Sequence, residues 1–236
     1  ARAVLKRDVI DIHTGGEDNI FPHHECEIAQ SRGATGENEF ARFWMHSRHL
    51  MVEGTKMSKS KGNFFTVRQI LDGKFTAPGS QGRPVAPAVL RYEMIKANYR
   101  SQMNFTKRGL EDSAANVRKL REYAAALEAQ AGEPAEVGIA HPAVARIVDE
   151  MADDLNIAEA LASVLEYLTE NQAAGMSAEA SAESLGVIRC FDQVLGVLPV
   201  ADAAGDDEAW AREKAAALEA ARADKDYAAA DAIRGE

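Results

Sequence analysis

The chain has 236 residues, of which 46% are hydrophobic and 27% charged, so we expect a soluble protein of one large or two small domains. No apolar run is long enough to cross a membrane, and the two cysteines, Cys26 and Cys190, are too few for a disulfide framework. These features predict a cytoplasmic protein. Because the chain does not start with Met, we also expect that an upstream portion is missing.

The net charge of −10 is unevenly distributed along the chain. Residues 1–110 carry 17 basic and 11 acidic side chains, whereas residues 111–236 carry 10 and 26. A nucleic-acid partner needs a positive surface, which the first part could supply. The acidic second part would need local basic stripes to bind RNA.

A short strand is expected at 9–12, because its residues are mostly β-branched, and we interpret it as buried. It runs into His13 and then a Gly15-Gly16 pair, at which backbone can approach a ligand closely. Asp18 follows and could accept hydrogen bonds from ribose hydroxyls. An ordinary glycine turn explains the same residues, and local evidence alone favours it.

The next stretch predicts a helix that starts at Pro22, a residue suited to the first helical position. His23 and Glu27 then lie one turn apart on one face and could share a metal ion such as zinc. His24 is predicted to face the packed side, and Cys26 to be a small apolar filler rather than a ligand. Two ligands are too few for a zinc site, so others must come from elsewhere.

A basic loop follows at 54–63, between a strand at 50–52 and a helix that begins at Val67. Lys56, Lys59 and the neighbouring serines suit a polyanion such as a triphosphate, because ammonium groups offset its charge. A solvated basic turn is the simpler interpretation of this composition. Upstream, Trp44 is expected in the core and His46 is expected to be a satisfied polar histidine.

The remaining sequence is almost wholly helical. We expect an exposed loop at 72–87, and apolar periodicity typical of helices in the segments 87–98, 109–131, 143–152, 156–171, 178–196 and 208–236. Asn156 and Glu159 are predicted to form a capping box. The helices from residue 109 on indicate a bundle with an ordinary apolar seam.

Taken in order, these motifs resemble cysteinyl-tRNA synthetase, a class I aminoacyl-tRNA synthetase. The resemblance rests on Asp11-Ile12-His13-x-Gly15-Gly16-x-Asp18, Phe21-Pro22-His23-His24-Glu25-x-Glu27, Trp44-Met45-His46, Lys56-Met57-Ser58-Lys59-Ser60, Tyr99-Arg100-Ser101-Gln102 and Met151-x-Asp153-Asp154-x-Asn156. It implies ATP-dependent attachment of cysteine to tRNA(Cys) through cysteinyl adenylate. Cys26 and Thr14 depart from the family's usual Asn and Gly.

The resemblance also implies roles for individual residues. His23 and Glu27 would be zinc ligands, and His13 would lie beside the substrate pocket. Gly16 and Asp18 would hold adenosine, together with Lys59 at the phosphates. Lys59, supported by Lys56, would be catalytic by stabilising charge as pyrophosphate leaves.

The resemblance further implies three parts within an α/β remnant of a Rossmann-like catalytic domain followed by a helical bundle. These are 1–49 in the catalytic domain, 50–108 with the lysine loop and stem contacts, and 109–236 as an anticodon-binding domain. The family's N-terminal half, with its HIGH-type motif and two cysteine ligands, is not in this sequence. We therefore expect a chain that cannot aminoacylate alone and that belongs to an enzyme monomeric when full length.

Two alternatives remain. One is the related ligase of the mycothiol pathway, which joins cysteine to an amino sugar and shares the lysine loop. The other is a non-catalytic tRNA-binding fragment. The long helical tail favours the synthetase, because a ligase for a small molecule needs no anticodon domain.

Overall fold

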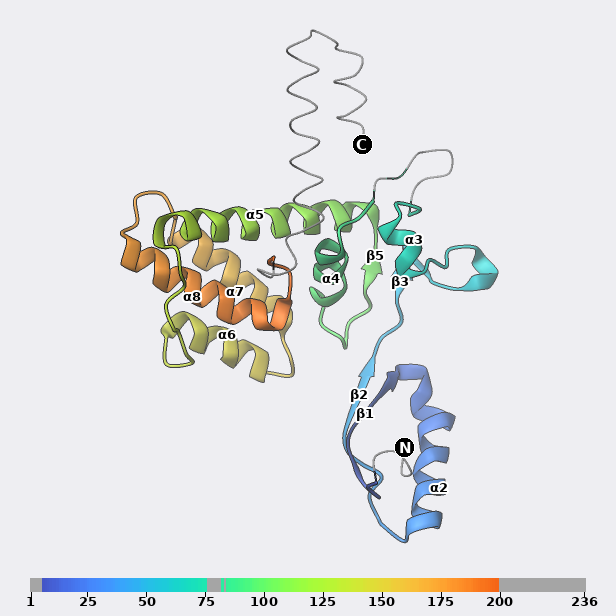
Figure 1. Ribbon diagram of the computed structural model, residues 1–236. Coiled ribbons are helices and arrows are strands. Elements are labelled where there is room, and N and C mark those ends of the chain that lie inside the picture. Colours follow the sequence, from blue (N-terminus) through green and yellow to red (C-terminus); the bar gives the residue numbers. More distant parts are fainter. Residues whose placement is uncertain (1–5, 76–81, 83, 200–236) are drawn as a thin grey trace.

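The structure is a computed structural model that describes residues 6–75, 82 and 84–199, and the statements below concern these residues. Two small sheets and a series of helices make up this part of the chain (Figure 1). The expectation of an α/β part followed by a mostly helical region is confirmed, and the assignment of the α/β part to a Rossmann-like domain stays a prediction. Among the described helices, none is both long and apolar enough to cross a membrane.

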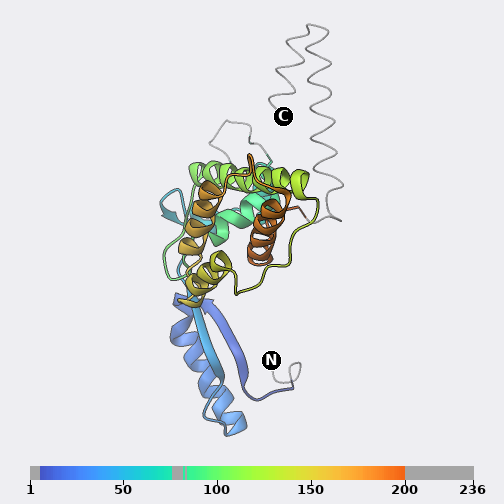
Figure 2. The ribbon, with the colours of Figure 1, turned by 90° about the vertical axis from the view of Figure 1, so that its left-hand side faces the viewer.

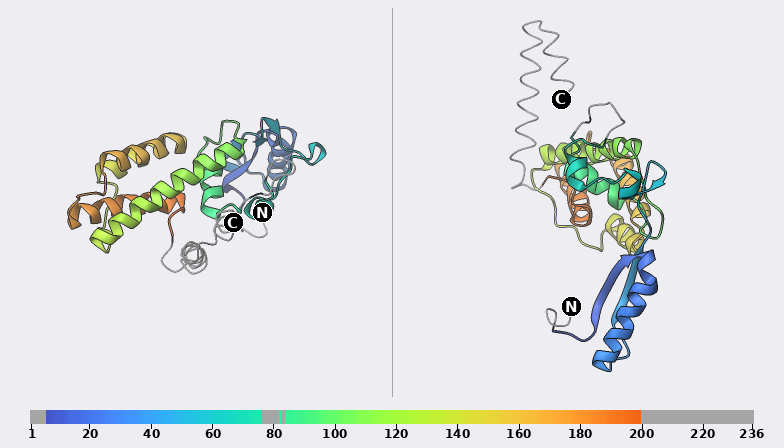
Figure 3. Two further views of the ribbon diagram at one scale, coloured as in Figure 1. Left: turned by 90° about the horizontal axis from the view of Figure 1, so that it is seen from above. Right: turned by 90° about the vertical axis from the view of Figure 1, so that its right-hand side faces the viewer.

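The first sheet is a parallel pair of strands, β1 (Ile10–Gly16) and β2 (Ala41–Ser47). A helical turn, η2 (Ile20–His24), and the helix α2 (Glu25–Thr35) connect the strands and cover one face (Figure 1). Gly36 ends α2 in the left-handed conformation with φ of 77°, which favours glycine. Figure 3 shows this β1–β2–α2 unit extending away from the helical region.

The other face of the pair is open, so the interpretation of β1 as a buried strand is wrong for the described residues. Ile12 and Phe43 are paired neighbours in the register and are 65% and 68% exposed. Side chains alternate between the two faces of a strand, so both lie on the face opposite His13 and Trp44. Parallel strands are normally covered on both faces, and here α2 covers only one.

The second sheet has the order β4-β3-β5 and holds the lysine loop. Its central strand β3 (Met51–Val52) pairs antiparallel with β4 (Thr55–Lys56) and parallel with β5 (Asn104–Phe105). A small core under this sheet contains Val52, Ile70, Leu90, Phe105 and Leu110. The predicted strand at 50–52 and the helix from Val67, here α3 (Val67–Leu71), are both confirmed.

The helical region contains α4 (Pro87–Ile95), α5 (Lys107–Ala131), α6 (Pro142–Ala152), α7 (Ile157–Glu170) and α8 (Ala178–Leu195). Helix α5 spans the region and packs along α8, while α6 packs on α7 (Figures 1 and 2). Their shared core includes Leu120, Leu127, Val164, Leu185 and Ile188. The three- and four-residue spacing of apolar side chains on α5 accounts for this buried stripe.

Helix ends in this region follow local signals. Thr106 and Ser177 accept hydrogen bonds from Gly109 N and Ala180 N, and so cap α5 and α8. Asn156 accepts from Glu159 N at 3.4 Å, which is one half of the predicted capping box. Helix α4 ends at Ile95, earlier than predicted. Part of the predicted loop at 72–87 and the whole predicted helix at 208–236 lie outside the described residues.

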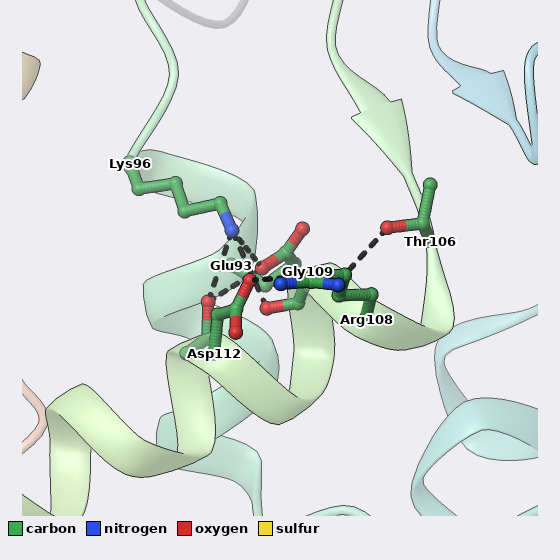
Figure 4. A network of polar contacts seen from close by, with 7 residues as sticks. Glu93, Lys96, Thr106, Arg108, Gly109 and Asp112 are labelled. Atoms are coloured by element: carbon green, nitrogen blue, oxygen red, sulfur yellow. Dashed lines mark hydrogen bonds and ion pairs between the residues drawn. The ribbon is translucent and has the colours of Figure 1, made fainter.

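A buried polar network joins α4 to α5 (Figure 4). The Glu93 carboxylate is 1% exposed and receives the Lys96 ammonium at 2.6 Å and the Ser113 hydroxyl at 2.5 Å. A Cβ at position 109 would lie 2.6 Å from Glu93 Oε1, so Gly109 leaves the space for this carboxylate. The network joins α4 to the first turns of α5, the helix that follows β5 along the chain.

Candidate functional site

The face of the β1–β2 pair that α2 covers is lined with polar aromatic side chains. In the parallel register His13 lies opposite Trp44, and Gly15 lies opposite His46. The His13 ring meets Trp44 edge-on with centroids 5.0 Å apart, and Trp44 stacks on His46 at 6.0 Å. Trp44 is half-buried in this cluster. The alternation of β1 and β2 thus brings three side chains from the two strands to one surface.

One carboxylate from α2 reaches this surface. Glu27 Oε2 lies 2.7 Å from His13 Nε2, and Glu27 Oε1 lies 3.7 Å from His23 Nε2. His13 and Glu27 are part-buried, whereas the His23 side chain is 63% exposed. The predicted one-turn spacing of His23 and Glu27 is confirmed. The structure therefore brings together His13, His23 and Glu27, three of the residues that the sequence singled out.

His24 is buried within the same cluster, with only 4% of its surface exposed. Its Nδ1 lies 2.8 Å from His46 Nε2, so one of the two nitrogens donates to the other. Burial, followed by the nearby His13 and His46, holds the pKa of His24 below its ordinary value and favours the neutral ring. The predictions that His24 faces the packed side and that His46 is a satisfied histidine are both confirmed.

Gly15 makes room for this buried ring. A Cβ at position 15 would lie 2.7 Å from His24 Cε1 and 2.9 Å from Nε2. The sequence pointed to the close approach that Gly15-Gly16 permits, but we interpreted it as space for a ligand. At Gly15, a side chain of the protein itself occupies that space.

The separation of His23 and Glu27 is compatible with a shared zinc ion. Tetrahedral Zn²⁺ with nitrogen and oxygen ligands separates its ligand atoms by roughly 3.3–3.6 Å. The 3.7 Å between His23 Nε2 and Glu27 Oε1 is close to this value, whereas the 2.7 Å between His13 and Glu27 is that of a hydrogen bond. His13 then orients the carboxylate by holding its second oxygen.

A second possible group of metal ligands was not anticipated from the sequence. Potential ligand atoms of His13, His24 and Glu27 all lie within 4.8 Å of one another. The sequence missed His24 because its neighbours along the chain indicated only packing. The signal that could have revealed it is His13, which enters the same cluster from the preceding strand.

At the end of β1, Asp18 folds back over Gly16. A Cβ at Gly16 would lie 2.6 Å from Asp18 Oδ1, so the glycine is required for this approach. Gly16 and Asp18, predicted to hold adenosine, are therefore neighbours in space beside the histidine cluster. The intervening Glu17 carboxylate forms an ion pair with Arg48 at 3.2 Å.

The lysine loop is organised by its own side chains. Asn63 accepts from Ser58 N and donates to the Thr55 and Lys56 carbonyls, which closes the loop between β4 and η3 (Lys59–Lys61). Lys56 Nζ lies 3.0 Å from His49 Nε2, and Lys59 Nζ lies 5.5 Å from the Phe64 ring centroid. Both lysines are exposed. The loop belongs to the β4-β3-β5 sheet, separate from the histidine cluster on β1–β2 (Figure 1).

The part of the chain that holds both of these features is similar to a known catalytic domain. Residues 1–115 match the family model for the catalytic domain of class I (C) tRNA synthetases. We call residues 1–115, which are similar to this catalytic domain, the synthetase segment. Both the histidine cluster and the lysine loop fall within this synthetase segment, as does the beginning of α5.

Curated relatives extend the similarity beyond the synthetase segment. The chain is 38% identical to a cysteine–tRNA ligase of Chlamydia muridarum, over 96% of this chain and 49% of the relative. It is 40% identical to that of Symbiobacterium thermophilum, over 97% of this chain and 49% of the relative. The chain spans about half the length of the curated relatives that it matches.

A solved structure supports the fold. The Agrobacterium radiobacter K84 agnB2 LeuRS, in its ternary complex with tRNA and LeuAMS, superposes with a TM-score of 0.55. The match covers 79% of this chain and 26% of LeuRS at 15% identity. The described chain therefore has a class I tRNA synthetase-like fold. The roles of His13, Gly16, Asp18, His23, Glu27, Lys56 and Lys59 remain predictions.

Proposed function

We propose that this chain is part of a cysteine–tRNA ligase and carries one portion of its catalytic site. The reaction joins cysteine to ATP as cysteinyl adenylate, releasing pyrophosphate, and then transfers the cysteinyl group to tRNA(Cys). The observation that supports this proposal is 36–40% identity to curated cysteine–tRNA ligases across almost the whole chain. Under this proposal, the enzyme acts in the cytoplasm.

The histidine cluster would recognise the amino acid. His23 Nε2 and Glu27 Oε1 would hold a zinc ion, which supplies a soft site for the thiolate of cysteine when bound. His13 fixes the other oxygen of Glu27 at 2.7 Å and would line the substrate pocket. Burial favours the neutral form of His24, which is hydrogen-bonded to His46 and would help to hold the cluster in place.

Nucleotide chemistry would use two separate elements. Gly16 and Asp18 at the end of β1 would bind adenosine, because the Asp18 carboxylate can accept from ribose hydroxyls. Lys59, with Lys56, would offset negative charge on the triphosphate as pyrophosphate leaves. The substrate carboxylate is the nucleophile, so no side chain of this chain needs to attack.

Three functional parts follow under this proposal. Residues 1–49 would be a section of a Rossmann-like catalytic domain, 50–108 would carry the lysine loop and contact the tRNA stem, and 109–236 would bind the anticodon region. The open face of β1–β2, where Ile12 and Phe43 are exposed side by side, would pack against the remaining section of the catalytic domain. That remaining section is the partner expected for catalysis.

Cysteine-dependent exchange of labelled pyrophosphate into ATP tests the proposal. The 236-residue chain alone should be inactive, and activity should appear when the N-terminal half of a related cysteine–tRNA ligase is supplied as a separate chain. A Lys59→Ala variant of this chain should abolish that recovered exchange, whereas Lys74→Ala, outside the lysine loop, should not. Robust exchange by the chain alone would refute the proposal that the catalytic site is divided between this chain and the N-terminal half.

Filter binding of tRNA over a salt series provides an independent test. Binding that prefers tRNA(Cys) to other tRNAs supports the assignment of residues 109–236. An amino-sugar ligase should bind no tRNA specifically, at any salt concentration. Absence of any preference for tRNA(Cys) would therefore favour the small-molecule ligase over the synthetase.

A further inference from the structure

Two sequence motifs that lie far apart along the chain meet at one carboxylate. The Tyr99 hydroxyl donates to Asp154 Oδ1 at 2.6 Å. Arg100 donates from Nε to Asp154 Oδ2 at 2.5 Å and from Nη2 to Oδ1 at 3.2 Å. Tyr99 and Arg100 lie in the loop between α4 and β5, and Asp154 lies in the turn between α6 and α7. The contact therefore joins the lysine-loop region to the helical bundle.

The same loop is fastened on its other side to the catalytic unit. Arg48, just after β2, donates from its backbone N to Tyr99 O at 3.0 Å and from Nε to Arg100 O at 3.2 Å. Its Nη1 lies 3.2 Å from the Glu17 carboxylate, next to Gly16 and Asp18. A continuous series of polar contacts thus runs from the end of β1 to the α6–α7 turn.

The backbone of the turn has an unusual conformation. Asp154 and Leu155 have φ angles of 54° and 57°, in the left-handed region. Asp tolerates this conformation, whereas a residue such as Leu rarely adopts it. Such conformations persist when surrounding contacts determine them. Leu155 lines a largely apolar cavity of about 470 Å³ together with Met45 and Met94, from β2 and α4. The turn is therefore held where three parts of the chain converge.

We propose that Asp154 is a positioning residue, which with Tyr99 and Arg100 sets the orientation of the helical bundle relative to the β1–β2–α2 unit. On the proposed function, this contact fixes the distance from the tRNA-binding surface of the bundle to the catalytic residues. Helices α6 and α7 have their own core with α5 and α8, so the bundle does not need Asp154 in order to fold. The carboxylate acts on the relative placement of the two parts.

Spin labels on either side of this contact measure the orientation directly. Cys26 is exposed on α2, so its interpretation as an apolar filler is wrong. The exposed thiol offers a natural labelling position. The second label is attached to Glu170→Cys at the end of α7, in a background with Cys190→Ser. Pulsed electron paramagnetic resonance then measures the distance distribution between the labels on α2 and on the bundle in the 236-residue chain. The measurement needs neither tRNA nor catalytic activity.

The variants distinguish the effect of the Asp154 carboxylate from the effect of the backbone conformation of the turn. Asp154→Gly removes the carboxylate but favours the left-handed conformation, and Arg100→Ala leaves the turn sequence unchanged. Both should convert one narrow distance distribution into a broad or shifted one, while Asp153→Ala should not. Asp154→Asn, which keeps one acceptor and tolerates the left-handed backbone, should partly restore the narrow distribution.

Thermal unfolding of the same samples distinguishes positioning from stabilisation alone. A contact that only stabilises the bundle would lower its melting temperature and leave the distance distribution narrow, and that result would overturn the proposal. An unchanged distribution in Arg100→Ala would overturn it as well. Neither readout uses tRNA or pyrophosphate exchange. Failure of the ligase assignment would therefore leave the positioning result unaffected, and failure of the positioning proposal would leave the ligase assignment unaffected.

Discussion

The imidazole of His13 and the carboxylate of Glu27 lie 2.7 Å apart, although the two residues are 14 positions apart along the chain. His13 projects from β1 and Glu27 from the first turn of α2. This contact occupies Glu27 Oε2 and leaves Oε1 facing His23 at 3.7 Å. One carboxylate is therefore shared between an orienting histidine and a potential metal site.

We predict that the 236-residue chain binds zinc weakly and loses it on dialysis against a chelator, because His23 and Glu27 supply only two ligands. His13→Ala should weaken that binding by about 10-fold or more, because the carboxylate loses its orienting partner. Competition with a chromophoric chelator measures both affinities. His141→Ala is the control, since His141 pairs with Glu183 at 3.1 Å on the bundle. Equal losses in the two variants would contradict the prediction.

We predict that the folded protein holds the pKa of His24 below its ordinary value. The stability of the β1–β2–α2 unit should then rise with pH between the lowered pKa and the ordinary pKa. The folded ring is held neutral by burial, so the unfolded chain binds more protons than the folded chain there. The stabilisation is fully present above the ordinary pKa and is lost as pH falls from there through the lowered pKa of the folded ring. Histidine proton resonances followed by NMR give the midpoint. A His24 midpoint at or above the ordinary histidine value would contradict this prediction.

Two glycines within helices should respond oppositely to alanine. In α8, a Cβ at Gly186 would collide with the Ala135 carbonyl oxygen, so Gly186→Ala forces the backbone apart and should destabilise the chain. In α2, Gly33 has no atom within 4 Å of such a Cβ, and Gly33→Ala should stabilise its helix by about 0.5–1 kcal/mol. Urea unfolding measures both changes. Stabilisation by Gly186→Ala would contradict this prediction and show that segment 135–138 moves away from α8 at little cost in free energy.

The Glu93–Lys96 contact should contribute more to stability than ion pairs on the surface. Lys96→Met leaves the buried Glu93 carboxylate without its cation and should cost about 3–5 kcal/mol of unfolding free energy. Arg118→Met, which breaks an exposed pair with Glu122 at 4.0 Å on α5, should cost about 0.5 kcal/mol or less. Urea unfolding at neutral pH compares them. Equal costs would indicate that Ser113 alone satisfies Glu93.

The bundle core should be sensitive to truncation of the closely packed Leu127 side chain. Its side chain is 0% exposed in α5, and Leu127→Ala should cost about 2–5 kcal/mol because the surrounding helices only partly fill the space left behind. Val148→Ala, on the exposed side of α6, should cost little. Thermal and urea unfolding both test the difference. Loss of less than about 1 kcal/mol at Leu127 would point to a loosely packed core.

Local signals in the sequence determined most of the elements. The apolar periodicity of α5 and α8 and the glycine after α8 each act within one or two turns, so the sequence predicted these two helices closely. The one-turn spacing of His23 and Glu27 is likewise a local property of a helix. The order of the motifs along the chain was by itself enough to indicate the synthetase family.

Tertiary structure decided which of these residues meet. The pairing of His13 with Glu27, the burial of His24 against Gly15 and His46, and the contact of Arg100 with Asp154 all join residues that are not neighbours in sequence. No periodicity encodes them, because they depend on how β1, β2 and the helices are placed in space. The exposed face at Ile12 and Phe43 was missed for the same reason: a β-branched run predicts a strand, but only the arrangement of the elements determines what covers it.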